Sequence, residues 1–204
     1  MKPKFTTLII ITLVSAAILT PFVFSSYYIP LLREYHFQLL LFLQDDLYKF
    51  ITGYTALALV ILEIMLTARK RGRSWLVKLT VPGSMQLWRS LHIFVGVGLL
   101  GLILIHTLGA TGLNFNAIFL WIFWGVSLSA LVGVVAETGI VESPQKLFLT
   151  WMPQQSSRQQ KMSGVPKGVL IRGLRSIWLT SHIILVSIFM VMLGFHIFLA
   201  YYYQ

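Results

Sequence analysis

The sequence of 204 residues contains no cysteine. Disulfides, thiolate metal sites, iron–sulfur clusters and covalently attached c-type haem all need cysteine, so its absence excludes each of them. Charged residues are also scarce, since only 11% of the chain is Asp, Glu, Lys or Arg and just six residues are acidic. So low a charge content argues against a soluble globular domain.

Apolar residues take the place of the missing charges. They make up 57% of the chain, and the mean hydropathy is +0.80. A helix needs about 20 residues to cross a bilayer core of about 30 Å. We therefore predict an all-α, polytopic membrane bundle forming one domain over residues 1–204. The first span follows a short basic start, and we take it as retained rather than as a signal peptide. Five spans have the required length: 5–24, 47–68, 91–109, 117–136 and 177–203.

Basic residues are distributed unevenly between the two sides of such a bundle. Six lie in the segment 69–89 and six in the segment 137–176, while Lys2 and Lys4 precede the first span. With five spans, these fourteen of the sixteen basic residues fall on one side, which the positive-inside rule makes cytoplasmic. Arg33 and Lys49 lie around the connection between the first two spans. The N-terminus is therefore predicted to be cytoplasmic and the C-terminus outside, with tyrosines at 201–203 as an interfacial anchor.

Histidine is the unexpected residue type in these apolar spans. His92 and His106 lie fourteen residues apart in the third span, and His182 and His196 repeat this spacing in the fifth. Fourteen residues at about 100° each make nearly four turns, so both imidazoles of a span leave one face, about 21 Å apart. Because the two spans run in the same direction, we expect His92 beside His182 and His106 beside His196. The remaining histidine, His36, is interpreted as a solvated residue of the outer connection.

Two facing imidazoles can hold a metal macrocycle between them. Without cysteine the group that fits is non-covalent haem b with two axial histidines, so the four residues predict two b haems. Zinc is less suited, because it takes three or four ligands within one small site. A proton relay needs carboxylates between the histidines, and the faces between them are apolar. Hydrogen bonding between helices is the ordinary role of a membrane histidine and is the structural alternative.

A glycine and three arginines are further candidates for contact with the haems. Gly96 lies about one turn after His92, where it either makes room for a flat ring or serves close helix packing. Arg89 and Arg175, together with Arg172, lie just inside the inner pair. Arginines at this depth either bind haem propionates through bidentate hydrogen bonds or simply reflect the topology.

The segments that carry these histidines resemble a known membrane family. The stretches WRSLHIFVGVGLLGLILIHT and SHIILVSIFMVMLGFH, with the span between them, are similar to dihaem cytochromes b. They look most like the ferric reductase-like transmembrane domain, found in ferric reductases, NADPH oxidases and bacterial haem-binding subunits of periplasmic reductases. The resemblance covers about residues 47–203. It implies that His92, His106, His182 and His196 are the axial ligands, and that electrons pass from one side of the membrane to the other.

The sequence departs from the larger members of that family. Ferric reductases and NADPH oxidases carry flavin and nicotinamide domains after the last helix, whereas this sequence ends at Gln204 and has no G-x-G-x-x-G after a strand pattern. We therefore expect the membrane cytochrome subunit of a larger redox complex, with a redox partner on one or both membrane faces. The predicted location is the bacterial inner membrane. The net charge of +10 is attributed to topology, and no nucleic acid partner is expected.

Two other functions are compatible with the same features. The first keeps the haems and adds a quinone site for quinol oxidation, with Asp45, Asp46 or Glu63 as proton acceptor. Asp45 and Asp46 equally suit a helix N-cap and a first-turn acid, and Glu63 equally suits pairing with Arg69 or Lys70. The second is a haem-free anchoring or assembly subunit, which a haem spectrum would distinguish at once.

Overall fold

The structure is a computed structural model in which residues 4–71, 81–144, 147–149 and 164–202 are described. It confirms the predicted all-α, polytopic bundle, since five helices are long and apolar enough to span a membrane. Two shorter helices, α2 (Ser25–Tyr35) and α3 (Phe37–Gln44), connect the first two of these, and β1 (Leu147–Leu149) pairs antiparallel with β2 (Gly164–Pro166). The five long helices are α1 (Phe5–Val23), α4 (Asp46–Arg71), α5 (Met85–Thr107), α6 (Phe115–Glu142) and α7 (Lys167–Tyr202).

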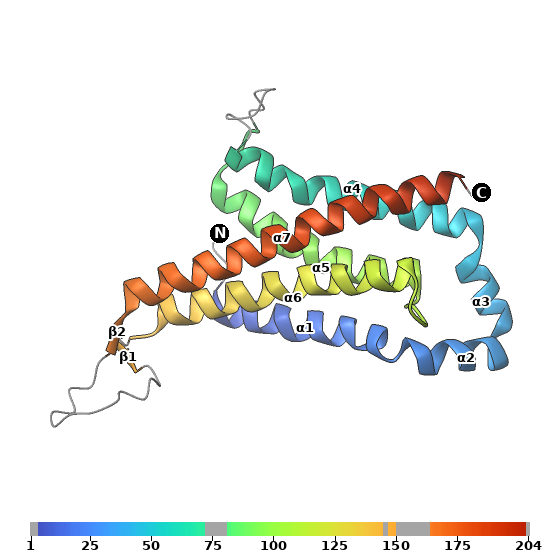
Figure 1. Cartoon of the computed structure of the whole chain (residues 1–204), viewed down its shortest axis with the longest axis horizontal. Helices are drawn as coiled ribbons and strands as arrows, with labels where there is room; N and C mark the ends of the chain where they lie inside the picture. The colour runs from blue at the N-terminus through green and yellow to red at the C-terminus, as the bar shows by residue number, and fades with distance from the viewer. Residues whose placement is uncertain (1–3, 72–80, 145–146, 150–163, 203–204) are drawn as a thin grey trace.

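The long helices run roughly along one common direction, and successive ones point in opposite directions. Figure 1 shows that α1, α5 and α7 begin at the end of the bundle where α4 and α6 finish. We call this the basic end, and the opposite end the distal end; the positive-inside rule predicts that the basic end is cytoplasmic. Some residues used in the sequence prediction lie outside the described residues, namely Tyr203 and the basic residues at 2, 73, 78, 146, 158 and 161. The described basic residues of the basic end are Lys4, Arg69, Lys70, Arg71, Arg89, Lys167, Arg172 and Arg175.

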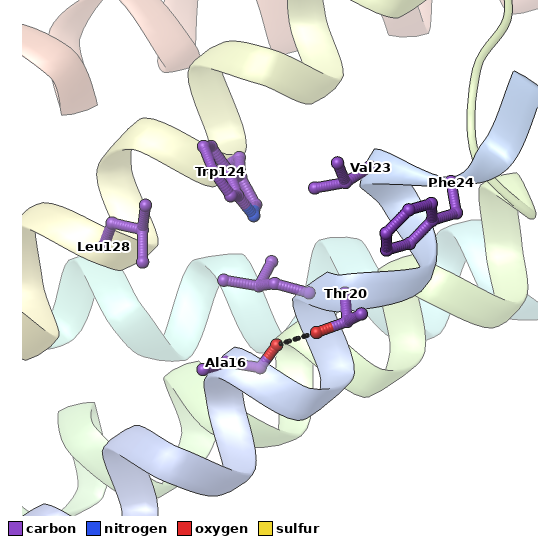
Figure 2. A pocket seen from close by; sticks show the side chains of 7 residues that line it. Ala16, Thr20, Val23, Phe24, Trp124 and Leu128 are labelled. Atoms are coloured by element: carbon purple, nitrogen blue, oxygen red, sulfur yellow. Dashed lines mark hydrogen bonds between the residues drawn. The ribbon is translucent and has the colours of Figure 1, made fainter.

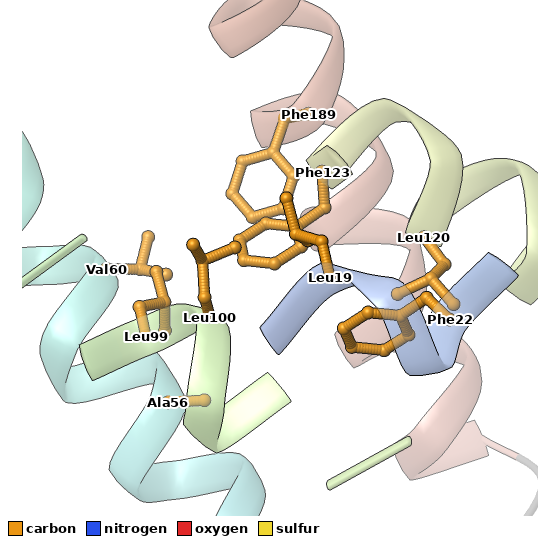
Figure 3. Close-up of a cluster of buried hydrophobic side chains, with 9 residues drawn as sticks. All are labelled: Leu19, Phe22, Ala56, Val60, Leu99, Leu100, Leu120, Phe123 and Phe189. Atoms are coloured by element: carbon orange, nitrogen blue, oxygen red, sulfur yellow. The ribbon is translucent and has the colours of Figure 1, made fainter. Parts of the chain in front are cut away.

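The bundle consists of two antiparallel helix pairs joined by α1. Helix α4 packs along α5, α6 packs along α7, and α1 contacts both α5 and α6. Helices α5 and α7, which carry the four predicted ligands, are not packed directly along each other. The apolar core draws on all five long helices (Figure 3), so it closes the middle of the bundle between the two ends. Its buried residues are Leu19, Phe22, Ala56, Val60, Leu99, Leu100, Leu120, Phe123 and Phe189.

Helix boundaries follow capping residues rather than the ends of the apolar runs. Helix α5 begins six residues before the predicted span because the side chain of Ser84 accepts a hydrogen bond from the backbone N–H of Leu87. It ends at Thr107, since Leu108 is left-handed with φ of 57° and Gly109 follows with φ of 104°. Asn114 caps α6 in the same way as Ser84 caps α5, by accepting from the N–H of Ala117.

Helices α6 and α7 extend beyond their predicted spans at the basic end. Helix α7 has 36 residues and starts ten residues before the predicted boundary. At about 1.5 Å per residue it is about 54 Å long, far more than a bilayer core needs. Polar contacts hold the extension together: Arg175 pairs with Glu137 of α6, and the Lys167 ammonium donates to the carbonyls of Val141 and Ser143. Hydropathy detects only the membrane-embedded part of such helices.

Close packing of α6 on α7 depends on Gly133. A Cβ atom at this position would overlap the indole ring of Trp178, one turn before His182 on α7. The Gly133→Ala protein must therefore displace a rigid ring, and we expect its free energy of unfolding to fall by about 1–3 kcal/mol. Thermal melting of the purified protein in detergent measures the effect. Gly98→Ala on α5 is the matched control, because among the described residues no atom beyond its own stretch of helix lies within 4 Å of its Cβ position. An equal loss in both variants would contradict this packing argument.

Candidate functional site

The structure brings the four histidines of α5 and α7 together as two pairs. The ring centroids of His92 and His182 are 6.4 Å apart at the basic end, and those of His106 and His196 are 6.4 Å apart at the distal end. The two rings of each pair are almost perpendicular, with interplanar angles of 85° and 82°. We call these the basic-end pair and the distal pair. His36 lies apart from them, exposed between α2 and α3.

Hydroxyl groups on the neighbouring helices bind one nitrogen of two histidines. Thr52 Oγ1 of α4 lies 2.8 Å from His106 Nδ1, and Ser129 Oγ of α6 lies 2.8 Å from His182 Nδ1. Each hydroxyl already donates its proton within its own helix, Thr52 to the carbonyl of Tyr48 and Ser129 to that of Val126. A hydroxyl has only one proton, so towards the imidazole it must accept. Both histidines therefore carry their proton on Nδ1, which leaves the Nε2 lone pair available.

The group beside Nδ1 of His92 is a carboxylate, whereas His106 and His182 each have a hydroxyl there. Oε2 of Glu63, on α4, contacts Nδ1 of His92, and the glutamate side chain is only 16% exposed. Nδ1 of His92 has no hydrogen-bond partner among the described residues, so this is a charge contact, and the negative charge beside Nδ1 favours a proton on that nitrogen. A Cβ atom at Gly96 would lie 3.6 Å from Oε1 of Glu63, which places this glycine at the contact of α4 with α5, beside the carboxylate.

His196 has an aromatic neighbour. The ring of Phe119, on α6, lies 5.3 Å from that of His196 at 33°. Phe119 also stacks on Phe189 at 5.3 Å and 17°, and Phe189 is a buried member of the core. The apolar core therefore extends directly to the distal pair. The four imidazoles thus have three kinds of neighbour, namely a carboxylate, two hydroxyls and an aromatic ring.

The pairs suit a metal macrocycle with two axial imidazoles. A metal–imidazole bond is about 2 Å and a ring nitrogen lies about 1 Å from its ring centre, so two imidazoles on one metal have centroids about 6 Å apart. Both observed separations are 6.4 Å. Bonding at Nδ1 also matches the way metal-ligating histidines are normally oriented. Among the described residues no three His, Cys, Asp or Glu side chains gather at one point, so an ordinary zinc site is not formed there.

Two of the arginines predicted to bind haem propionates differ in exposure and pairing. Arg89 is exposed on the second turn of α5, and the guanidinium of Arg175 is paired with the Glu137 carboxylate. A further polar group on the same side of the basic-end pair is the indole N–H of Trp178, one turn before His182 on α7. This N–H is buried and has no hydrogen-bond partner among the described residues. An indole N–H is a donor only, and an acidic group of a bound molecule would satisfy it.

The acids considered for quinol oxidation are engaged elsewhere. Asp45 is confirmed as an N-cap, because its carboxylate accepts from the backbone N–H of Leu47 and Tyr48, and Asp46 is a first-turn acid of α4. Glu63 contacts His92, while Arg69 donates to the carbonyl of Gly83. Neither Glu63 nor Arg69 therefore makes the pairing considered from the sequence.

A pocket of about 250 Å³ lies between α1 and α6, and no histidine lines it. Figure 2 shows Trp124 and Leu128 of α6 on one side and the apolar face of α1, with Thr20, on the other. The Thr20 hydroxyl donates to the carbonyl of Ala16, and the buried N–H of Trp124 has no partner among the described residues. None of the residues that line the pocket is acidic, so it offers no proton acceptor for quinol oxidation.

The Nδ1 partners were not predicted from the sequence. The sequence favours a quinol base or an ion-pair partner at Glu63, and it predicts no role for Thr52 or Ser129. One signal was present on α4, where Thr52 and Glu63 are eleven residues apart. Eleven residues make about three turns, so both side chains leave the same face of an apolar helix. Ser129 has no such companion, and only the packing of α6 on α7 reveals it.

Loss of an Nδ1 partner should weaken one site selectively. The Thr52→Val substitution keeps the shape and removes the hydroxyl that accepts from His106, so we expect 10–100-fold weaker binding of a cofactor at the distal pair. The measurement is the cofactor content of purified protein and its rate of loss to an excess of acceptor protein. Thr55→Val is the matched control, because the Thr55 hydroxyl is exposed, and its partner in the described part of the chain is the carbonyl of Ile51 on its own helix. Equal losses in both variants would show that Thr52 has no special part.

Comparison with protein-family models, with curated proteins and with solved structures gives no match. The function is therefore argued from the two histidine pairs and their surroundings.

Proposed function

We propose that the chain is a dihaem membrane cytochrome b that carries electrons across the bilayer as a subunit of a larger redox complex. The observation that supports this most directly is the pair of matched sites. In each, two imidazoles from different helices lie with their ring centroids at the spacing expected of two ligands on one metal. The resemblance of the histidine-bearing stretches to the ferric reductase-like transmembrane domain points the same way. The proposed location is the bacterial inner membrane.

The side chains of the bundle would bind and orient the two haems. Nε2 of His92 and His182 would ligate one iron, and Nε2 of His106 and His196 the other. When bound, haem supplies one-electron exchange between ferric and ferrous iron. Thr52, Ser129 and Glu63 hold three of the imidazoles in the tautomer that can ligate a metal.

The core between the two pairs supports transfer without moving parts. It is filled by leucine, valine and phenylalanine side chains, and Phe189 with Phe119 reaches from the core to His196. The paired ligands of a helix are about 21 Å apart along its axis, and macrocycles that extend towards each other shorten that gap. A dry core also keeps water and protons from crossing with the electrons. The chain would therefore conduct electrons while it keeps the membrane sealed.

A haem-free role explains the site less well. Burying an imidazole without satisfying both of its nitrogens is costly. Among the described residues, three histidines are contacted at Nδ1, which leaves Nε2 as the nitrogen available to a metal. Ligation would use that nitrogen, whereas a haem-free role gives it no part.

A redox partner would complete the path on each side. At the basic end α6 and α7 extend beyond the membrane-embedded length, and Arg89 and Arg172 are exposed. A positively charged surface attracts acidic proteins and anionic lipid. We therefore propose an acidic electron-transfer partner at this end, and a periplasmic or quinone-linked partner at the distal end.

The number and type of haems test the proposal. The purified protein should hold two low-spin b haems per chain, extractable with acidic solvent, and neither should bind carbon monoxide readily. His92→Ala and His182→Ala should remove one spectral component, and His106→Ala and His196→Ala the other. Perpendicular imidazole planes should give a highly anisotropic low-spin EPR signal, because they leave two iron orbitals nearly equal in energy. One haem per chain, or loss of the same component from His92→Ala and His106→Ala, would contradict the proposal.

Transfer across a sealed membrane tests conduction itself. The chain is reconstituted in vesicles with ferricyanide inside, and dithionite is added outside. Electrons should cross, and the rate should fall to that of empty vesicles in His106→Ala and in His182→Ala, because each removes one of the two sites. His36→Ala is the control and should conduct normally, since His36 is exposed and away from both pairs. Unchanged crossing in both ligand variants would rule out conduction through the pairs.

A further inference from the structure

The two histidine pairs differ in the charge placed beside them by one helix. At the basic-end pair, α4 contributes the Glu63 carboxylate, which contacts Nδ1 of His92. At the distal pair the same helix contributes the neutral hydroxyl of Thr52 to His106. It also contributes Lys49, whose ammonium donates to the carbonyl of His106. Helix α4 therefore presents a negative group to one site, and a neutral and a positive group to the other.

A carboxylate at Nδ1 changes the ligand as well as orienting it. It draws the Nδ1 proton towards itself, so the imidazole becomes a stronger electron donor at Nε2. A stronger donor and a nearby negative charge both stabilise ferric over ferrous iron, which lowers the reduction potential. A hydroxyl that already donates to a carbonyl is a weaker, uncharged acceptor, and an ammonium favours the reduced state. The same fold thus offers unequal surroundings to two otherwise similar ligand pairs.

We propose that Glu63 is a positioning residue that sets the haem of the basic-end pair to a lower potential than the haem of the distal pair. This inference rests on the proposed function, since it needs both haems. Lys49 acts in the same sense by raising the potential of the distal haem. At equilibrium a single electron in the chain would then reside mainly at the distal pair.

Two arginines at the basic end, Arg89 and Arg175, act less strongly on this haem than Glu63 does. Arg175 is paired with Glu137, and Arg89 is exposed, where water and salt screen it. Glu63 is mostly buried and touches the ligand itself, so its field is screened least. Contact and burial therefore give the carboxylate the larger influence on its haem.

The experiment is a spectroscopic redox titration of the purified full chain in wild-type, Glu63→Gln and Glu63→Asp forms. Gln keeps the shape and an acceptor oxygen but removes the charge. The wild type should titrate as two components, and the lower one should rise in Glu63→Gln. The expected rise is at least a tenfold change in the ratio of ferric to ferrous haem at fixed potential, or about 59 mV for a one-electron couple. Glu63→Asp keeps the charge but moves it away from His92, so the lower component should rise less than in Glu63→Gln, and the higher component should not move in either variant.

Two further variants test the effect of charge at the distal pair. Thr52→Asp places a carboxylate beside His106 in a side chain of similar size, and should lower the higher component. Lys49→Gln should also lower the higher component, because it removes a positive charge. Ser129→Ala is a control at the basic-end pair: it removes the hydroxyl beside His182 without changing a charge, so it should shift the lower component less than Glu63→Gln does.

The outcomes separate this inference from the function on which it rests. Fewer than two haems in the wild type would contradict the proposed function. Two haems with equal potentials, or with potentials that Glu63→Gln leaves unchanged, would overturn only the role of Glu63. If Glu63→Gln fails to retain its haem, the potential of the higher component in Thr52→Asp is the deciding measurement. A lower potential than in the wild type supports the inference, and an unchanged potential overturns it.

Discussion

An imidazole inside a membrane bundle must have both nitrogens satisfied, and the arrangement of this protein depends on that requirement. An unpaired polar group in an apolar environment costs several kcal/mol by typical estimates, about 2–7. Helices α4 and α6 contribute few polar side chains to the interior, and Thr52, Glu63 and Ser129 are all used on a histidine. The hairpin-like pairing of α4 with α5 and of α6 with α7 follows from the need to bring each acceptor to its imidazole.

At His106 and His182, a backbone carbonyl, a side-chain hydroxyl and the imidazole are hydrogen-bonded in series. This series determines which imidazole nitrogen carries the proton. In Thr52 and Ser129 the hydroxyl proton is directed to a carbonyl of the preceding turn, as is common for these residues in apolar helices. This fixes the tautomer of the histidine without any charge in the membrane. On α4 the acceptors are about 16 Å apart, whereas the histidines that they serve are about 21 Å apart. The longer side chain of glutamate spans part of that difference, which explains why the two acceptors are not the same residue type.

The distribution of packing explains why the sites lie where they do. Helix α5 packs on α4 and α1, and α7 packs on α6, while α5 and α7 are held apart and meet through their histidine rings. The core seals the middle of the bundle, with Phe189 contributing from α7. The two histidine pairs therefore lie on either side of the apolar core, which is the arrangement that the proposed electron transfer across a membrane would need.

The class of fold and the pairing of the four histidines could be predicted from the sequence alone. Long apolar runs allow few alternatives to helices in a bilayer, and fourteen-residue spacing is a property of a single helix that needs no knowledge of its neighbours. Helix boundaries were predicted less well, because caps such as Ser84 and the contact of Arg175 with Glu137 extend helices beyond the apolar runs. The partners of the histidines were decided only by tertiary structure. Glu63 and His92 are 29 residues apart and Ser129 and His182 are 53 apart, so the rotation and register of packed helices bring them together. Glu63 thereby contacts a histidine rather than a nearby arginine or lysine on its own helix.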